Sequence, residues 1–455
     1  MTGSTAEPPR RTARDLLRPA DGPSGSTASD PPGGPSGRTA SGPLDGPTLR
    51  GRAHGPSRRA ALGLLGAVPL TAGGVLAASG VAAAAGRSGG VPADLRPGGA
   101  FDRYVRDLAE RDQFSGTVLL AHRGRHVLAR AYGMADRERR IPNDLDTIYA
   151  MASASKPFTG LAVVRLAQEG RLRFYDKVGA HLDGFPAEIA EHVTVHQMLT
   201  HTSGMTDPTN DATDPRVFTS VEERNQDLAA RARSQRLRFT PGTAKEYSSM
   251  GYEVLGELVA KVSGQPFHEY VREHVFERAG MADSAYYTRT RWLADERIAH
   301  PYMLQEDGTR VDGVRNLDKG GVSGVKGSNS ARAFIGSGGG NGFTTAPDLV
   351  RFALALQRDE LLKRAYTELY VNAKVSGPPL REGPADPRRG EAFHAYGPTA
   401  STFNDRRYIS HGGGIAGGST NWSIYLDLDW VAVVLCNYDL QIEPIIEQER
   451  SRITA

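Results

Sequence analysis

A serine and a lysine three residues apart stand out in the segment MASASKPFTG, residues 151–160. Eight of the 55 basic residues of the chain are lysines, and Lys156 is the first of them. Lysine can give up its proton inside a protein, whereas arginine keeps its charge. Residues i and i+3 of a helix share one face, so Ser153 and Lys156 would lie side by side there. The pair predicts a serine nucleophile with an amine as its base. Because Ser-x-x-Lys is common by chance, this prediction needs partners elsewhere in the chain.

Two downstream segments offer such partners. Tyr247 lies in KEYSSMGY, just before a predicted helix. A positive charge beside a tyrosine favours its ionised form, so a tyrosine near a lysine can pass protons at neutral pH. His411 precedes three glycines in SHGGGIAGG. Glycine lets the backbone approach a ligand closely, and a strand-edge N–H there could complete an oxyanion hole. Taken alone, Tyr247 is better explained by packing, and His411 by a plain turn.

The predicted nucleophile lies at the start of a helix. The run KPFTGLAVVRLAQEG has apolar residues at helical spacing and ends at Gly170. Pro157 is tolerated in the first turn of a helix, which places the helix start between Ser153 and Lys156. The positive end of the helix dipole would therefore stabilise an oxyanion formed at Ser153.

Strand and helix signals at the two ends of the chain predict the fold class. Residues 101–114 read as a helix, and β-rich runs on either side of Gly124 read as a hairpin. A second hairpin is expected to turn at residues 428–429, followed by a terminal helix over 443–453. We predict an α/β protein of the α+β type, in which strands from both chain ends form one antiparallel sheet flanked by helices, with an inserted, mainly helical lobe. The middle of the chain is expected to hold two more helices and a glycine-rich loop, at 194–200, 251–263 and 320–342.

The N-terminal part of the chain differs from the rest. Residues 1–56 are rich in proline, glycine and serine and are expected to be disordered. Residues 57–86 hold an arginine pair followed by an uncharged, small-residue-rich segment, which is typical of a twin-arginine export signal. Residues 87–100 would then be a linker, and 101–455 the catalytic domain. This predicts a secreted or cell-envelope protein that contacts the membrane only through an uncleaved signal.

Composition narrows the classes of function. A net charge of +3 over 455 residues gives no support for nucleic-acid binding. Cys436 is the single cysteine, which excludes an intrachain disulfide and a lipoprotein anchor after the signal. His192, His196 and His201 are spaced so that they do not share one helix face, so we expect structural roles for them, no metal site and no cofactor.

Together, these motifs resemble the serine β-lactamase and penicillin-binding-protein family, most closely its class C-like branch, which also holds esterases, D-aminopeptidases and DD-carboxypeptidases. The order Ser-x-x-Lys, Tyr-Ser-x and His-Gly-Gly carries the resemblance. It is extended by FSGTVLLAHRG, VTVHQMLTHTSGM, PGTAKEYSSMGYEVLGELV and GGGNGFTTAPDLVRFALAL, and it spans about residues 101 to 439. The resemblance implies a β-lactamase/transpeptidase-like fold.

The resemblance also implies a role for each motif residue. Ser153 would be the acylated nucleophile, Lys156 its activating amine and Tyr247 the proton shuttle. The backbone N–H groups of Ser153 and Gly414 would form the oxyanion hole. The residues implied to contact substrate are Ser249, His411, Gly412 and Gly413.

The chain departs from the family pattern at two of these positions. Ser249 replaces the asparagine of Tyr-x-Asn, which commonly contacts a substrate amide. His411 replaces the lysine of Lys-Thr-Gly, so a fixed positive charge for a β-lactam carboxylate is missing. We therefore expect an exported serine hydrolase that forms an acyl-enzyme on Ser153 and takes a small-molecule or peptide acyl substrate: an ester, an amide or a lactam. The alternative is a binder of cell-wall peptides or β-lactams that does not turn over.

Overall fold

The computed structural model describes residues 90–206, 214–323, 326–377 and 388–455. The predicted disordered segment and the predicted export signal lie outside these ranges. Within them, a short 3-10 turn over Ala93–Leu95 precedes the first helix, and the Leu95 side chain is fully buried.

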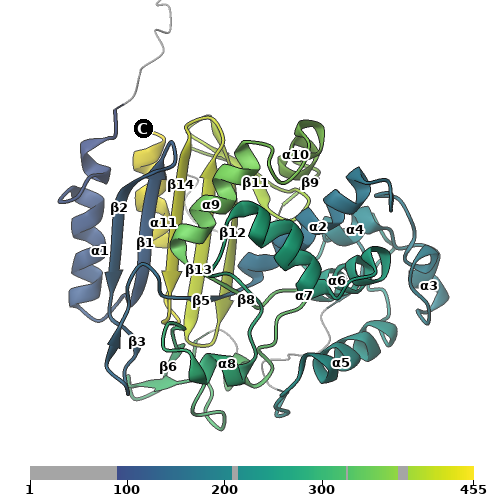
Figure 1. Ribbon diagram of the computed structural model, residues 1–455, viewed down its shortest axis with the longest axis horizontal. Helices are drawn as coiled ribbons and strands as arrows, with labels where there is room; N and C mark the ends of the chain where they lie inside the picture. The colour runs from purple at the N-terminus through teal and green to yellow at the C-terminus, as the bar shows by residue number, and fades with distance from the viewer. Residues whose placement is uncertain (1–89, 207–213, 324–325, 378–387) are drawn as a thin grey trace, which may run out of the picture. The chain divides into compact units, whose positions relative to one another are not determined.

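One large antiparallel sheet forms the centre of the described part of the chain (Figure 1). Its strand order is β2-β1-β14-β13-β12-β11-β10-β9. The strands are β1 (Gly116–His122), β2 (Arg125–Tyr132), β9 (Val375–Ser376), β10 (Arg389–His394), β11 (Thr399–Phe403), β12 (Arg406–Ile415), β13 (Gly418–Tyr425) and β14 (Trp430–Cys436). The first strand of the chain pairs with the last one along its whole length, from Gly116 opposite Cys436 to His122 opposite Trp430. The prediction of one sheet built from both chain ends is confirmed.

Eleven helices are named in the described ranges. They are α1 (Ala100–Glu110), α2 (Lys156–Gln168), α3 (Ala187–Ala190), α4 (Val195–Leu199), α5 (Val221–Arg233), α6 (Ser249–Ser263), α7 (Phe267–Val271), α8 (Arg289–Ala294), α9 (Ala346–Gln357), α10 (Arg364–Val371) and α11 (Glu443–Ile453). Three small two-stranded sheets join β3 (Met134–Asp136) to β4 (Ile141–Pro142), β5 (Tyr149–Ala152) to β8 (Gly342–Thr344), and β6 (Tyr302–Leu304) to β7 (Arg310–Asp312). None of the helices in these ranges is long and apolar enough to cross a membrane.

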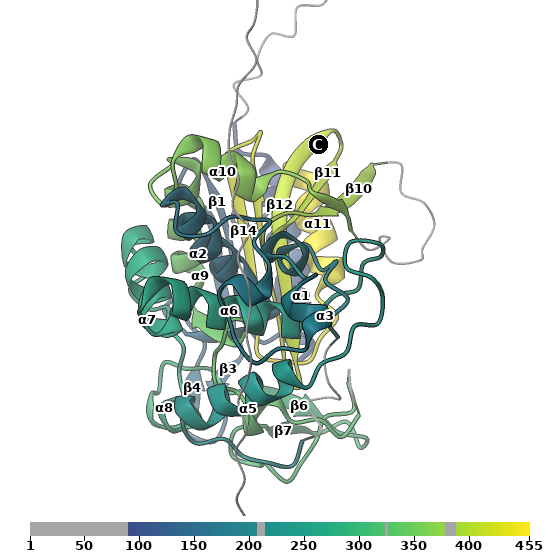
Figure 2. The same ribbon diagram turned by 90° about the vertical axis from the view of Figure 1, so that its right-hand side faces the viewer.

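Helices cover both faces of the sheet, which explains why β1 and β14 are apolar on both sides. Val118 and Leu120 of β1 pack with side chains of α1 and α11. The intervening Leu119 packs in a second cluster, with Phe158 of α2 and Phe352 of α9. In Figure 1, α1 lies at the left of the sheet and the helical lobe at the right. This lobe, which Figure 2 shows from its own side, is the insertion that the sequence predicts.

The predicted helices appear with small shifts of their ends. The helix expected over 443–453 is α11, with the same bounds, and the one expected over 251–263 is α6, closed by Gly264 in the left-handed region (φ 73°). The helix expected over 101–114 is α1, which ends earlier because Asp112 adopts a positive φ of 53°. The predicted loop at 320–342 contains a 3-10 turn over Ser330–Arg332, and its last residue begins β8.

Candidate active site

Ser153 lies in a sharp turn between β5 and α2. The residue before it, Ala152, has φ 48° and ψ −129°, a region that residues with side chains rarely occupy. The Ala152 carbonyl oxygen accepts hydrogen bonds from Ser155 Oγ (2.7 Å) and from the Asn341 N–H (3.0 Å). These contacts hold the strained turn, so Ser153 stays partly exposed at the start of α2 while Ser155 and Lys156 are buried.

The Lys156 amine is held by three oxygen atoms. Its side chain is fully buried, and Nζ lies 3.1 Å from Ser153 Oγ and 3.2 Å from Ser249 Oγ. The third acceptor is the carbonyl oxygen of Gly339. An ammonium group has three donors, so three acceptors fix its orientation. The structure therefore brings Ser153, Lys156 and Ser249 together, with the amine directed at the serine hydroxyl.

Tyr247 lies over the same amine. Lys156 Nζ is 5.0 Å from the centroid of the Tyr247 ring, and the Tyr247 side chain is 45% exposed. The ring also stacks on the imidazole of His201, at 4.5 Å between centroids and an interplanar angle of 27°. His201 in turn stacks on Tyr252. The position of Tyr247 is therefore set by a stack of aromatic rings that reaches into the buried part of the lobe.

His201 supports this stack as a neutral ring. Burial lowers the pKa of His201 well below its ordinary value, and the nearby groups His394 and Lys156 lower it further. Its Nδ1 accepts a hydrogen bond from the Ser248 N–H at 3.1 Å, so Nε2 carries the proton. The sequence predicts a structural role for His201, but it gives no indication that this role is to support Tyr247. The sequence feature that could have pointed to this role is the stretch HTSG, which begins with His201 and is part of the resemblance to the family.

Strand β12 passes beside the Ser153 turn. A Cβ atom added to Gly413 would lie 2.0 Å from the Met151 carbonyl oxygen and 2.8 Å from the Ala154 nitrogen. A Cβ added to Gly414 would meet no described atom within 4 Å. From the neighbouring strand, Trp422 Nε1 donates to the Ala154 carbonyl oxygen at 3.0 Å. Glycine at 413 is therefore required for the strand to approach the turn, and Gly414 borders open space.

His411 is the strand residue in the position implied for substrate contact. Its Nδ1 donates to the Gly412 carbonyl oxygen at 2.7 Å, which leaves Nε2 as an acceptor. Burial and then the Lys156 charge lower the pKa of His411 to about 3. The imidazole is thus neutral at neutral pH. The site has a hydrogen-bond acceptor where a lysine would have placed a positive charge.

The histidines outside this cluster have other contacts. His196 Nδ1 lies 2.9 Å from the Tyr396 hydroxyl, and its ring stacks on Tyr175. The His192 carbonyl oxygen accepts a hydrogen bond from Lys177 Nζ at 3.3 Å. In the described ranges, no group of three or more histidine, cysteine, aspartate or glutamate side chains could hold a metal ion.

A serine hydroxyl with a buried lysine amine, at the junction of a helical lobe and an antiparallel sheet, defines the class of serine hydrolases built on this fold. Comparison with known proteins identifies the family: the model of the Beta-lactamase family matches residues 101–450. The chain belongs to this family, whose members are serine hydrolases. Its fold and the resemblance predicted from the motifs are confirmed.

Individual relatives agree with this assignment. The chain is 28% identical over 356 residues to Penicillin-binding protein 4* of Bacillus subtilis (strain 168), which covers 74% of this chain and 71% of that protein. A penicillin binding protein from Bacillus halodurans has a similar structure, with a TM-score of 0.64 and 27% identity over 76% of this chain and 98% of that one. D-amino acid amidase from Ochrobactrum anthropi SV3 shares the fold, with a TM-score of 0.61 and 18% identity over 78% of this chain and 99% of that one.

Proposed function

We propose that the chain is an exported hydrolase that forms a covalent acyl-enzyme on Ser153. The observation that carries this proposal is the distance of 3.1 Å between Ser153 Oγ and the amine of the buried Lys156. Hydrogen-bond contact between a nucleophile and its base is the geometry that activates a serine. The predicted roles of the surrounding residues follow from this pair.

The proposed reaction has two steps. Once the Lys156 ammonium has lost a proton, the lone pair of the amine faces Ser153 Oγ in place of an N–H. This lone pair takes the Ser153 hydroxyl proton as Oγ bonds to the substrate carbonyl carbon. The oxyanion that forms is stabilised by the N–H groups of Ser153 and Gly414. The leaving group departs with a proton delivered through Tyr247, which leaves an ester on Ser153. A water molecule then loses a proton to the same Lys156–Tyr247 pair and attacks this ester. As the ester bond breaks, the pair returns the proton to Ser153 Oγ and the acid is released.

The site favours esters over β-lactams among the acyl substrates of this family. The neutral His411 supplies no fixed positive charge for a substrate carboxylate. Ser249 is held by Lys156 at 3.2 Å and has no side-chain amide to bind a peptide substrate. An ester without a carboxylate needs neither contact. Because two of the relatives are named as penicillin-binding proteins, a peptide and a lactam are tested beside the ester.

A substrate panel tests this proposal. Purified protein is incubated with p-nitrophenyl acetate, a D-amino-acid peptide and nitrocefin, together with the Ser153→Ala variant. We expect sustained hydrolysis of the ester, and a loss of several orders of magnitude in the variant. A folded Ser153→Ala protein that keeps its activity would exclude Ser153 as the nucleophile.

The second candidate function is capture without turnover. It is favoured by the contact between Ser249 and Lys156, because the hydroxyl occupies one of the donors of the amine at the place where the family has an asparagine. Such a protein would release one equivalent of product in a burst and then stop. Steady release over many equivalents would reject this candidate.

A further inference from the structure

A short segment rich in glycine lies between the two central helices of the lobe. We call residues 337–340 the glycine strap. The Gly338 carbonyl oxygen accepts a hydrogen bond from Thr159 Oγ1 of α2 at 2.8 Å. On the opposite side, a Cβ added to Gly338 would lie 2.6 Å from the Cα atom of Gly256 in α6. The strap is therefore clamped between α2 and α6, and it reaches this position because glycines meet there.

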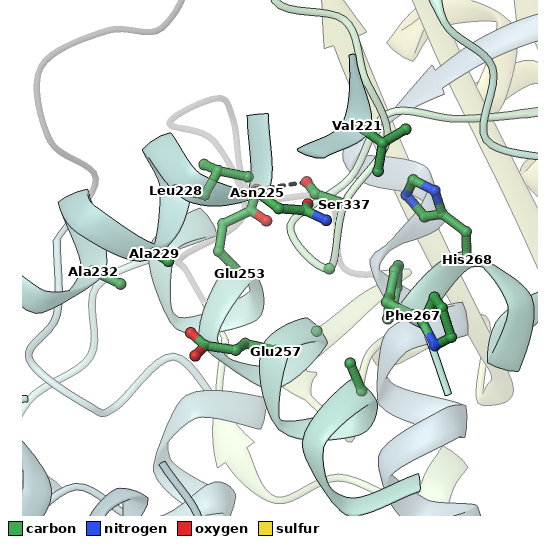
Figure 3. Close-up of a pocket in the computed structure, with 14 residues that line it drawn as sticks. Val221, Asn225, Leu228, Ala229, Ala232, Glu253, Glu257, Phe267, His268 and Ser337 are labelled. Carbon is green, nitrogen blue, oxygen red and sulfur yellow. Dashed lines mark hydrogen bonds between the residues drawn. The ribbon is translucent and has the colours of Figure 1, made fainter. Parts of the chain in front are cut away.

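Glu253 of α6 holds the strap from one side. Ser337 Oγ donates to Glu253 Oε1 at 2.8 Å, and the two side chains point toward one another in Figure 3. The Gly339 N–H donates to the same carboxylate. The approach is so close that a Cβ added to Gly339 would lie 2.2 Å from Glu253 Oε1. The two donors fix the strap to the carboxylate.

Lys156 holds the same strap from the other side, because its Nζ donates to the Gly339 carbonyl oxygen. Gly339 thus bonds to both groups: its N–H donates to the Glu253 carboxylate, and its carbonyl oxygen accepts from the Lys156 amine. A displacement of the strap would move one of the three acceptors that orient the amine toward Ser153.

We propose that Glu253 is a positioning residue for Lys156, acting through the glycine strap, and this inference rests on the proposed function of Ser153 and Lys156. Glu253 contacts neither Ser153 nor the amine directly. It fixes the acceptor that orients the amine. Lys156 lowers the pKa of the Glu253 carboxyl, so the two groups also interact electrostatically, and removing the charge of Glu253 removes this interaction.

The surroundings of Glu253 set its own charge. Its carboxyl borders a cavity of about 190 Å³ between α5, α6 and α7, which Figure 3 shows. Burial raises the pKa of Glu253, while Arg224 and the hydrogen bond from Ser337 lower it. The titratable groups that face this carboxyl or line the cavity are Lys156 of α2, Arg224 of α5, Glu257 of α6, His268 of α7 and Tyr286.

Two variants of Glu253 separate its two effects. Glu253→Ala removes the acceptor, so we expect kcat/KM on the ester to fall by about tenfold or more at every pH. Glu253→Gln keeps an oxygen that accepts from Ser337 and Gly339 but removes the charge. We expect activity within about threefold of the wild type at the pH optimum, and an acidic limb of the kcat/KM profile shifted to lower pH by about half a unit or more.

Glu257→Gln is the matched control. Glu257 lies one turn further along α6, lines the same cavity and pairs with Arg233 at 2.6 Å. Among the described residues, the hydrogen bonds that Glu257 accepts come from Arg233 and not from the strap, so its variant should keep the wild-type pH profile. Thermal unfolding of all variants would show whether any loss comes from an unfolded protein.

Three results would overturn the proposal. The first is activity of both Glu253 variants within about twofold of wild type with an unchanged profile. The second is equal impairment of Glu253→Gln and Glu253→Ala without a pH shift, which would indicate a purely structural role. The third is a crystal structure of Glu253→Ala in which Gly339 and the Lys156 amine keep their places. The crystal structure needs no substrate, so it decides the inference even if the wild-type protein proves inactive and the proposed function fails.

Discussion

At the scale of single residues, the site depends on which groups are charged. Lys156 is fully buried and oriented by three oxygens, and the imidazoles of His201 and His411 beside it are kept neutral. The sequence predicts Ser153, Lys156 and Tyr247 from residue type, order and spacing. It does not reveal the acceptor at Gly339 or the stack of Tyr247 on His201. These contacts join segments far apart in the chain, and only packing brings them together.

Replacing the lysine by arginine tests whether a removable proton is needed. Arginine has a pKa above about 12, so it keeps the positive charge but gives no base at neutral pH. We expect kcat/KM of Lys156→Arg to fall by about a hundredfold or more, close to the loss in Lys156→Ala. Thermal unfolding is measured alongside, because the larger guanidinium costs about 1–3 kcal/mol of stability if it overpacks the site. Ester hydrolysis by a folded Lys156→Arg protein within about threefold of wild type would show that the amine is not the base.

The neutral histidines predict how stability depends on pH. Burial lowers the pKa of His394 to about 4, whereas an unfolded histidine has a pKa of about 6.5. Between these values the unfolded state binds a proton that the folded state does not bind. The contribution of the neutral His394 to the free energy of unfolding should therefore be complete above about pH 6.5 and should be lost as the pH falls toward 4. The free energy of unfolding is measured by urea titration at several pH values in this range. Its slope against pH should be smaller for His394→Gln than for the wild type, by an amount that corresponds to about one proton. Identical slopes would mean that His394 does not titrate in this way.

At the scale of elements, the candidate site lies where three of them meet: the turn before α2, the start of α6 and strand β12. Hydrophobic periodicity and helix caps predict most of these elements, because the signals are local. Thr194 caps α4 through a capping box, and Gly264 ends α6. The short sheets β5–β8 and β6–β7 are not predicted, because strands of three or four residues leave no periodicity to read.

The approach of β12 to the Ser153 turn predicts a difference between two adjacent glycines. In Gly413→Ala the new methyl group would meet backbone atoms of Met151 and Ala154, which have no freedom to move aside. We expect a loss of stability of about 1–3 kcal/mol. In Gly414→Ala the new methyl group would meet no described atom within 4 Å, so the unfolding temperature of this variant should stay near that of the wild type. Equal unfolding temperatures for the two variants would contradict the close contact of strand and turn.

At the scale of the whole molecule, the pairing of β1 with β14 joins the N-terminal hairpin to the C-terminal strands in one sheet, so the helical lobe is inserted between strands from opposite chain ends. Two strong hairpin patterns at the chain ends make this arrangement predictable. The order of the remaining strands depends on long-range pairing that the sequence does not specify by itself. The described part of the chain contains the whole candidate site. The export prediction concerns residues 57–86, which lie outside the described ranges.

The export prediction is tested by the arginine pair. If residues 57–86 form a twin-arginine signal, then replacing Arg58 and Arg59 together by lysine should keep the protein inside the cell, although the charge is unchanged. Fractionation of cells that carry the signal on a reporter measures this. Normal export of the double variant would remove the twin-arginine assignment and leave the assignment of the hydrolase domain unaffected.

The central claim, a covalent intermediate on Ser153, is tested most directly by trapping it. The protein is mixed with p-nitrophenyl acetate, quenched in acid during steady turnover, digested and analysed by peptide mass spectrometry. We expect one acetyl group on the peptide with Ser153, at the Ser153 hydroxyl, and its absence in Ser153→Ala. An acetyl group on another residue, or turnover without any adduct on Ser153 when a fluorophosphonate probe also leaves it unlabelled, would contradict the account.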